Sequence, residues 1–308
     1  ILLGNLPAGL QLHERRWELL KGEFQPKSTQ PVWLGETCIA GKVLYLHREQ
    51  GLGDTLQFCR YATMAARAGA QVILEVESTL VRPISSLQGV TRVIAEDDPV
   101  PDHDLRCPIM SLPLAFGTTI ETIPAEIPYL HADPADAEMW RDRLRGIEGK
   151  KVGLVWAGAS RTGLGAGVVA ADRRRSIALA RLAPVTSVSG CTFFSLQLGA
   201  AAEQTKQAPA GMALRDHTGE LSDFADTAAL VDNLDLVISV DTSTAHLAGA
   251  MGKPVWLLNR FDTCWRWFLE REDSPWYPTM RIFRQPYPGD WDHVIRSVAS
   301  ALREFVAA

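Results

Sequence analysis

The chain has 308 residues, of which 46% are hydrophobic and 22% are charged, and its formal net charge is −5 at pH 7. This length is enough for two domains of about 150 residues each. The acidic balance gives no general basic field, so we expect no nucleic-acid partner. No apolar run approaches the roughly 20 residues of a membrane span, and no signal peptide is visible.

The cysteines are dispersed along the chain and show no CxxC spacing: they are Cys38, Cys59, Cys107, Cys191 and Cys264. An odd, scattered set is typical of a reducing compartment and argues against a structural zinc site. We therefore expect a cytoplasmic protein without a structural metal.

The first 36 residues stand apart as a short helical segment. Apolar residues recur at helical spacing between Leu10 and Leu20, and His13 to Arg16 form a charged face. Prolines and polar residues then predict a linker that ends near Gly41.

An alternation of strand and helix begins at Lys42 and predicts a parallel α/β domain over residues 37–134. The expected strands are residues 43–47, 71–76, 91–95 and 103–107, and the expected helices are residues 55–68 and 78–87. A loop or short helix is expected at 112–117. Three prolines between Thr118 and Pro134 indicate the exit from this domain.

A second α/β domain is predicted over residues 135–290. Its expected helices are 135–145, 177–182 and 224–231, its first strands are 150–156 and 191–197, and a Gly- and Ala-rich stretch, 162–171, reads as a mobile loop. An amphipathic helix over residues 291–308 ends the chain. The fold class is thus two open, doubly wound α/β domains facing a cleft, in which ligands bind at the carboxyl ends of the strands.

The clearest local pattern is Leu236 to Leu258, a buried strand, a tight turn, a short helix and another strand. Thr242 to Thr244 lie at the start of this helix, where free backbone N–H groups and the helix dipole suit a phosphate or diphosphate. Asp241 would cap the turn or accept a hydrogen bond from a sugar hydroxyl. The alternative is an ordinary βαβ unit with a Thr/Ser cap.

A second turn, Gly51-Leu52-Gly53-Asp54, follows the first strand and opens a helix. The glycines allow close approach of the backbone to a ligand, and Asp54 would act as a general base on an acceptor hydroxyl. The alternative is an Asp that caps the helix in a glycine turn. The pattern is not a full GxGxxG, so a dinucleotide fingerprint is weak.

Cations follow the strand of the second domain: Ser160 and Arg161 lie in its loop, and Arg173 to Arg175 come after it. They would neutralise a diphosphate leaving group, unless the loop is merely a solvated basic one. His246 would bind a phosphate or a sugar hydroxyl, or else pack in the core. Gln197 ends the next strand and faces the same edge.

Two further clusters are interpreted as structural. Asp102-His103-Asp104 has the DxD form of a metal site but begins a strand away from the phosphate turn, so we predict no metal there. The segment around Trp265, Trp267 and Trp276, with Arg266 and Arg271, would stack on a base or sugar, or else pack the tail of the chain.

Together the motifs resemble the glycosyltransferase domain of bacterial tetratricopeptide-repeat proteins, which are similar to the ADP-heptose:lipopolysaccharide heptosyltransferases of glycosyltransferase family nine. The resemblance rests on HREQGLGDTLQFCRY at 47–61, KVGLVWAG at 151–158, RRRS at 173–176, SLQ at 195–197 and ISVDTSTAHLAGAMGKPVW at 238–256. Residues 261–285 resemble the repeat-linked group in particular, and GLQLHERRW at 9–17 is similar to the tail of a repeat array.

The resemblance implies a GT-B fold whose C-terminal helix crosses back to the first domain. It also implies inverting, metal-independent transfer from a nucleotide sugar, with no cofactor. Asp54 matches the proposed base. The predicted nucleotide-sugar site comprises Gly51, Gly53, Gly158, Ser160, Arg161, Arg175, Gln197, Asp241, Thr242, Ser243, Thr244 and His246. The chain departs from the repeat-linked pattern at Ala159, where relatives usually have Asn, and in the 162–171 loop.

We therefore expect a glycosyltransferase that moves a sugar from a nucleotide sugar to a hydroxyl of a protein or glycan, with upstream tetratricopeptide repeats holding a protein acceptor. Two alternatives remain: a GT-B epimerase acting on a nucleotide sugar, and a non-catalytic scaffold that kept the fold. The sequence does not specify the sugar, the base or the acceptor.

Overall fold

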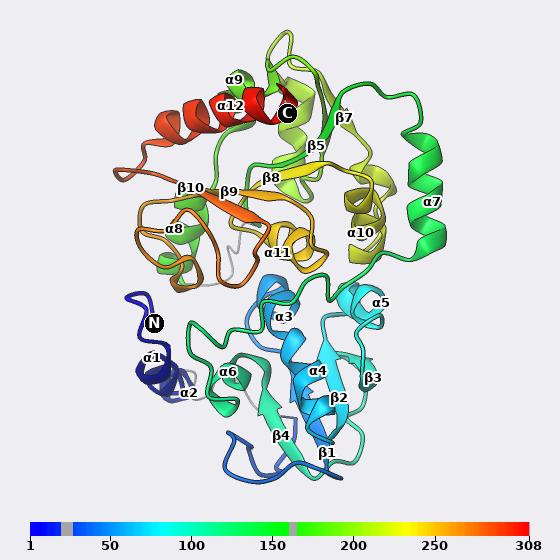
Figure 1. Cartoon of the computed structure of the whole chain (residues 1–308), viewed down its shortest axis with the longest axis vertical. Coiled ribbons are helices and arrows are strands. Elements are labelled where there is room, and N and C mark those ends of the chain that lie inside the picture. The colour runs from blue at the N-terminus through cyan, green and yellow to red at the C-terminus, as the bar shows by residue number, and fades with distance from the viewer. Residues whose placement is uncertain (20–26, 160–164, 308) are drawn as a thin grey trace. The chain divides into compact units, whose positions relative to one another are not determined.

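The protein is described by a computed structural model that covers residues 1–19, 27–159 and 165–307 (Figure 1). Its contacts divide the chain into two compact units. Unit 1 comprises Ile1–His131 and Cys264–Leu269, and unit 2 comprises Ala132–Thr263 and Glu270–Ala308. Each unit contains one parallel sheet, as the alternation of strands and helices predicts.

The sheet of unit 1 has the order β3-β2-β1-β4, and all neighbouring strands are parallel. The strands are β1 (Val43–His47), β2 (Gln71–Val76), β3 (Val90–Ala95) and β4 (Leu105–Pro108). In β1 and β2 every residue after the first is buried. Such continuous burial is typical of strands covered on both faces. The apolar runs inside these strands, 43–46 and 72–74, are why the sequence located them correctly.

The helices of unit 1 are shorter than predicted. They are α3 (Leu52–Phe58), α4 (Arg60–Arg67), α5 (Val81–Ile84) and α6 (Leu112–Ala115), with 3₁₀ turns η1 (Ser78–Leu80) and η2 (Ile109–Ser111). The predicted helix 55–68 is divided at Cys59. The predicted helix 78–87 is reduced to one α-helical turn after η1, because Pro83 is tolerated only in the first turn of an α-helix.

The N-terminal residues form two helices within unit 1, α1 (Leu6–His13) and α2 (Arg16–Leu19). Asn5 caps α1, since its side chain accepts a hydrogen bond from the N–H of Ala8 at 3.2 Å. Leu6 and Leu10 are buried. The expected single helix after Leu10 is therefore two, and its apolar side packs into the first unit.

The sheet of unit 2 has six parallel strands in the order β10-β9-β8-β5-β6-β7. The strands are β5 (Lys150–Val155), β6 (Cys191–Ser195), β7 (Leu214–Asp216), β8 (Leu236–Val240), β9 (Val255–Asn259) and β10 (Met280–Arg284). Read in chain order, this is the 3-2-1-4-5-6 arrangement of a Rossmann domain. Unit 1 has the 3-2-1-4 part of the same arrangement. The sequence missed both edge strands, β7 and β10.

The helices of unit 2 include the long C-terminal α12 (Trp291–Ala307), which contacts α9 and β10 within the same unit. Its crossing back to the first domain stays a prediction. The others are α7 (Pro134–Arg143), α8 (Ala166–Arg175), α9 (Ala183–Thr186), α10 (Phe224–Asp232) and α11 (Ser243–Ala250), with 3₁₀ turns η3 (Leu179–Leu182), η4 (Ala200–Gln207) and η5 (Thr218–Glu220). Within the described residues, no helix is long and apolar enough to cross a membrane.

The expected mobile loop at 162–171 is wrong for the described part of that stretch, because residues 166–171 belong to α8. Alanine favours helix, and a single Gly167 costs only about 1 kcal/mol in a helix interior. Three arginines in the last turn also complement the negative end of the helix dipole. The interpretation as a loop gave too much weight to glycine and too little to the alanines and arginines that follow it.

Candidate functional site

The order of the unit 2 sheet reverses between β5 and β8, which are direct neighbours. In open α/β sheets a ligand binds outside the carboxyl ends of the strands at this switch point. The chain leaves β5 through Ala157 and Gly158 and leaves β8 through Asp241 and Thr242. The two stretches with the clearest predicted chemistry in unit 2 therefore meet at one edge of one sheet.

The turn between β8 and α11 keeps the start of the helix open. Thr242 is the N-cap residue with extended backbone, but its side chain makes no capping hydrogen bond. Its hydroxyl instead lies 3.0 Å from the Ser239 hydroxyl. Ser243 and Thr244 form the first turn of α11, where backbone N–H groups have no intrahelical acceptor. These donors and the positive helix end are available to an anion.

Arg175 joins the ends of the two strands. It is the last residue of α8, and its Nη1 donates to the carbonyl of Asp241 at 2.7 Å. Its Nη2 donates to Asp172 Oδ1 at 2.7 Å. The Nε is buried and has no hydrogen-bond partner among the described residues. A guanidinium held beside the β8–α11 turn with one donor unused is well suited to a phosphate oxygen.

Gly158 provides the space for this arginine. A Cβ at Gly158 would lie 2.5 Å from Arg175 Cζ and 2.6 Å from Nη2, closer than real Cβ contacts allow. The Gly158 N–H donates to the Ser176 hydroxyl at 3.2 Å. The glycine is required because the guanidinium packs directly against the backbone at the end of β5.

Gln197 has a different role from the one its position suggested. It is 3% exposed, and its Oε1 accepts from the N–H groups of Trp156 and Ala157 at 3.0 and 2.8 Å. Its Nε2 donates to the carbonyls of Ala157 and Leu198 at 3.0 and 2.9 Å. The amide is thus used to fix the backbone after β5, so in this arrangement it positions the loop.

His246 lies in α11 and is 4% exposed. Its Nδ1 lies 2.9 Å from the Tyr277 hydroxyl, and the two rings meet edge to face. Its Nε2 lies 3.9 Å from Asp241 Oδ1. The contacts favour the packing role over the phosphate-binding one, and through Asp241 they hold the strand end that Arg175 contacts.

Asp54 lies in the first turn of α3, within unit 1. Its Oδ2 accepts from the N–H of Gly51, the N-cap residue, at 2.9 Å. Gly53 lies one residue before it in the same turn. The Oδ1 of Asp54 accepts from Nη2 of Arg266, and the two side chains form an ion pair. Both carboxylate oxygens are therefore engaged. The capping interpretation is confirmed, and the catalytic one stays a prediction.

Arg266 is the residue that sequence reasoning did not place in the site. It lies in η6 (Trp265–Trp267), 212 positions from Asp54. Only the Trp- and Arg-rich composition of this segment drew attention to it. The pair is formed by tertiary structure, so no local pattern could have identified it.

The switch point of unit 1, between β1 and β4, is filled by the chain itself. Glu49 follows β1 and accepts from the N–H of Met110, which follows β4, at 2.9 Å. Arg16 donates to both oxygens of Glu49 at 2.8 and 2.9 Å, and to the Ser111 hydroxyl at 2.7 Å. Burial raises the pKa of Glu49, and the guanidinium opposes this.

Two predicted site residues, Ser160 and Arg161, lie outside the described residues, so the loop after Ala159 stays a prediction. Within the described part of the chain no group of three or more His, Cys, Asp or Glu side chains could hold a metal ion.

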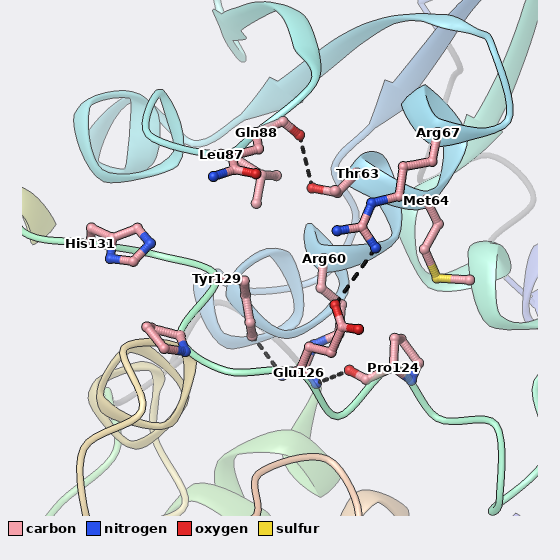
Figure 2. A pocket seen from close by; sticks show the side chains of 11 residues that line it. Arg60, Thr63, Met64, Arg67, Leu87, Gln88, Pro124, Glu126, Tyr129 and His131 are labelled. Carbon is pink, nitrogen blue, oxygen red and sulfur yellow. Dashed lines mark hydrogen bonds and ion pairs between the residues drawn. The ribbon is translucent and has the colours of Figure 1, made fainter.

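A pocket of about 130 Å³ lies in unit 1 and shares no residue with the predicted site (Figure 2). Arg60 donates to the Pro124 carbonyl and the Tyr129 hydroxyl at 2.7 and 2.8 Å. Figure 2 shows Arg67 directed toward Glu126, 3.6 Å away. Because these charged groups already have partners, the pocket offers less to an anion than the Arg175 site does.

No protein family model matches the chain. A curated relative is Protein FlbA of Caulobacter vibrioides, which is 28% identical over 330 residues, covering 95% of this chain and 52% of FlbA. The chain thus spans about half the length of this relative.

Solved structures share the fold at low sequence identity. The glycosyl transferase family 9 protein of Veillonella parvula has a TM-score of 0.57 and 9% identity, covering 81% of this chain and 87% of that one. The Escherichia coli ADP-heptose lps heptosyltransferase II has a TM-score of 0.58 and 12% identity, and the match covers 86% of this chain and 100% of that one. Heptosyltransferase WaaC of E. coli with ADP-2-deoxy-2-fluoro heptose has a TM-score of 0.52 and 13% identity, and the match covers 86% of this chain and 98% of that one. The predicted GT-B class, with two parallel Rossmann-like sheets, is confirmed.

Proposed function

We propose that the chain is a glycosyltransferase that transfers a sugar from a nucleotide sugar to a hydroxyl of a protein or glycan. The fold supports this, since proteins of the same fold carry the names of heptosyltransferases and one of them is described with an ADP sugar analogue. The fold alone does not specify the chemistry, so the proposal depends on the residues at the switch point of unit 2.

One observation carries the proposal: Arg175 lies at the switch point, beside the start of α11, with a buried Nε that has no hydrogen-bond partner among the described residues. An arginine and a helix N-terminus are the two groups that proteins use most readily to bind phosphate oxygens. We place the donor diphosphate there. The same charges would stabilise the leaving diphosphate, which is why we propose a metal-independent reaction.

The reaction is a displacement at the anomeric carbon of the sugar. The acceptor hydroxyl gives its proton to the Asp54 carboxylate, and its oxygen forms a bond to the anomeric carbon. The bond from that carbon to the phosphate oxygen breaks, and its electron pair leaves with the nucleoside diphosphate. Attack on the face opposite the leaving group inverts the configuration.

The acceptor belongs to the proposal as well. Because the chain spans about half of FlbA, the rest of a longer protein would have room for the tetratricopeptide repeats that the sequence resemblance implies. Such repeats present extended concave surfaces that hold peptides, so we propose a protein acceptor before a free glycan.

A second candidate, a non-catalytic scaffold of the same fold, is favoured by a specific observation. Both oxygens of Asp54 already have partners in the chain, Gly51 and Arg266. A carboxylate used only to cap α3 and to neutralise a buried arginine would need no substrate.

The test is a panel of ADP, UDP, GDP, CMP and their sugars, measured by thermal shift and then by calorimetry on the purified chain. We expect one nucleotide to bind, and Thr242→Trp to abolish its binding by filling the start of α11. Arg181→Gln, which changes an exposed arginine of η3 in unit 2, is the control and should bind normally. A folded wild-type protein that binds no member of the panel contradicts the donor site.

A further inference from the structure

The segment Cys264–Leu269 belongs to unit 1, although the chain on both sides of it belongs to unit 2. It lies in the connection between β9 and β10, and its Trp267 and Phe268 are buried at 0% and 3% exposure. Phe268, and Glu270 two residues later, have φ of +49° and +54°. Non-glycine residues rarely adopt this left-handed region, which persists where the surrounding structure holds it.

This segment places Arg266 on one face of α3. Its Nε donates to Gln57 Oε1 at 2.7 Å, and its Nη2 donates to Asp54 Oδ1. Its guanidinium also lies over the rings of Trp265 and Phe58, with centroids 4.5 and 5.5 Å away. Asp54, Gln57 and Phe58 are spaced three and four positions apart, so they share one face of the helical turn.

The ion pair is largely shielded from water, since Arg266 and Asp54 have side-chain exposures of 8% and 17%. Removal of one member of such a pair leaves an uncompensated charge. A guanidinium also fixes the direction of the carboxylate it contacts. Gly51 holds one oxygen of Asp54 and Arg266 holds the other, so the plane of the carboxylate is set at both ends.

The pair leaves capacity for a substrate. An ionised carboxylate has about four lone-pair sites, and the two contacts occupy one on each oxygen. We infer that Arg266 is a positioning residue for Asp54: it fixes the plane of the carboxylate that removes the acceptor proton. This inference rests on the proposed function.

The test compares Arg266→Gln, which removes the charge, with Arg266→Lys, which keeps it, once a donor and a hydroxyl acceptor are known. We expect Arg266→Gln to lower kcat at least tenfold with the donor KM changed less than threefold, and Arg266→Lys to retain an intermediate kcat. Asp54→Asn should lose as much activity alone as combined with Arg266→Gln.

The matched control is Arg271→Gln, a more exposed arginine of the same β9–β10 connection that is paired with Asp273. It should leave kcat and the donor KM unchanged. If Arg266→Gln does not fold, Arg266→Lys decides: a lowered kcat with an unchanged donor KM supports the role, and a wild-type kcat overturns it.

The failures of the two proposals are distinguishable. A wild-type protein that transfers no sugar contradicts the proposed function. A wild-type protein that transfers sugar, with a folded Arg266→Gln that matches it in kcat, contradicts only the positioning role of Arg266.

Discussion

The two sheets have the same strand order around their switch points, but the chain treats those points differently. In unit 1 the space between the ends of β1 and β4 is filled by Arg16, Glu49 and Ser111, which satisfy one another. In unit 2 the ends of β5 and β8 are joined by Arg175, whose Nε is left without a partner among the described residues. The strand order therefore marks two candidate sites. Only the hydrogen bonds at each switch point show that the one in unit 1 is filled by the chain and that the one in unit 2 has an arginine donor to offer.

The helices that follow these strands repeat the contrast. At the start of α3 the carboxylate of Asp54 accepts a hydrogen bond from the N–H of Gly51. At the start of α11 the Thr242 hydroxyl contacts Ser239 and leaves the first turn uncapped. The first arrangement offers a fixed carboxylate, and the second offers donors for an anion. This is why we assign proton removal to unit 1 and diphosphate binding to unit 2.

The largest expected effect comes from Asp54→Asn, which keeps the shape of the α3 turn and removes the base. General-base catalysis contributes about 10²–10⁴-fold, so kcat should fall by about that factor while nucleotide affinity stays within threefold. Steady-state kinetics with calorimetry of the nucleotide measures both. An unchanged kcat in a folded variant would falsify the catalytic role and favour the scaffold.

Arg175→Gln tests the open switch point of unit 2. Loss of a charge-assisted contact costs about 1.5–3 kcal/mol, so we expect nucleoside diphosphate affinity to fall about 10–100-fold. Calorimetry of the variant beside Arg181→Gln, which removes the same charge from an exposed arginine of η3 in the same unit, isolates the position. Equal affinities for the two variants would show that Arg175 does not contact the ligand.

His47 ends β1, beside the filled switch point. Burial, with smaller contributions from nearby cations, lowers its pKa from 6.5 to about 4. Between these values the unfolded chain binds more protons, so the stability contributed by neutral His47 is present above pH 6.5 and is lost as pH falls toward 4. From pH 7 to pH 5, wild type should lose about 2 kcal/mol more unfolding free energy than His47→Gln.

Urea unfolding at both pH values, on wild type and variant, measures this difference. Equal losses in the two proteins would mean that His47 titrates normally in the folded chain, and that the end of β1 is wetter than the contacts indicate.

Gly158→Ala gives the smallest expected effect and the most specific one. The added methyl group would overlap the Arg175 guanidinium and displace it, so we expect nucleotide affinity to fall about tenfold, in line with overpacking costs of about 1–3 kcal/mol. Gly167→Ala, where nothing lies within 4 Å, should bind normally and be slightly stabilised as a helical alanine. Normal binding by Gly158→Ala would remove the steric argument for the glycine.

The local sequence pattern was enough to predict most strands of the two sheets and the β8–α11 turn. The strands β1, β2, β5 and β8 each contain an apolar run, and the hydroxyl cluster after Asp241 follows the run of β8. The edge strands of unit 2, β7 and β10, were missed because a short strand has no strong period. β10 also contains two arginines, Arg281 and Arg284, which weaken its hydrophobic signal.

The site was less accessible to sequence reasoning, because its contacts are non-local. Gln197 was placed at the correct strand end, but the four hydrogen bonds that occupy its amide come from backbone brought there by the fold. Arg266 reaches Asp54 across 212 positions, and Arg16 reaches Glu49 through a helix that looked separate from the first domain. Residue type and spacing contain no information on such pairs.

The central claim is that the switch point of unit 2, and not that of unit 1, binds a nucleoside diphosphate. Amide NMR of the labelled chain during a nucleotide titration tests it most directly. We predict that the N–H signals of Ser243, Thr244 and Gly158 move with saturation, while those of Gly51 to Asp54 do not. Saturable shifts at Gly51 to Asp54, with none at Ser243 and Thr244, would contradict the account.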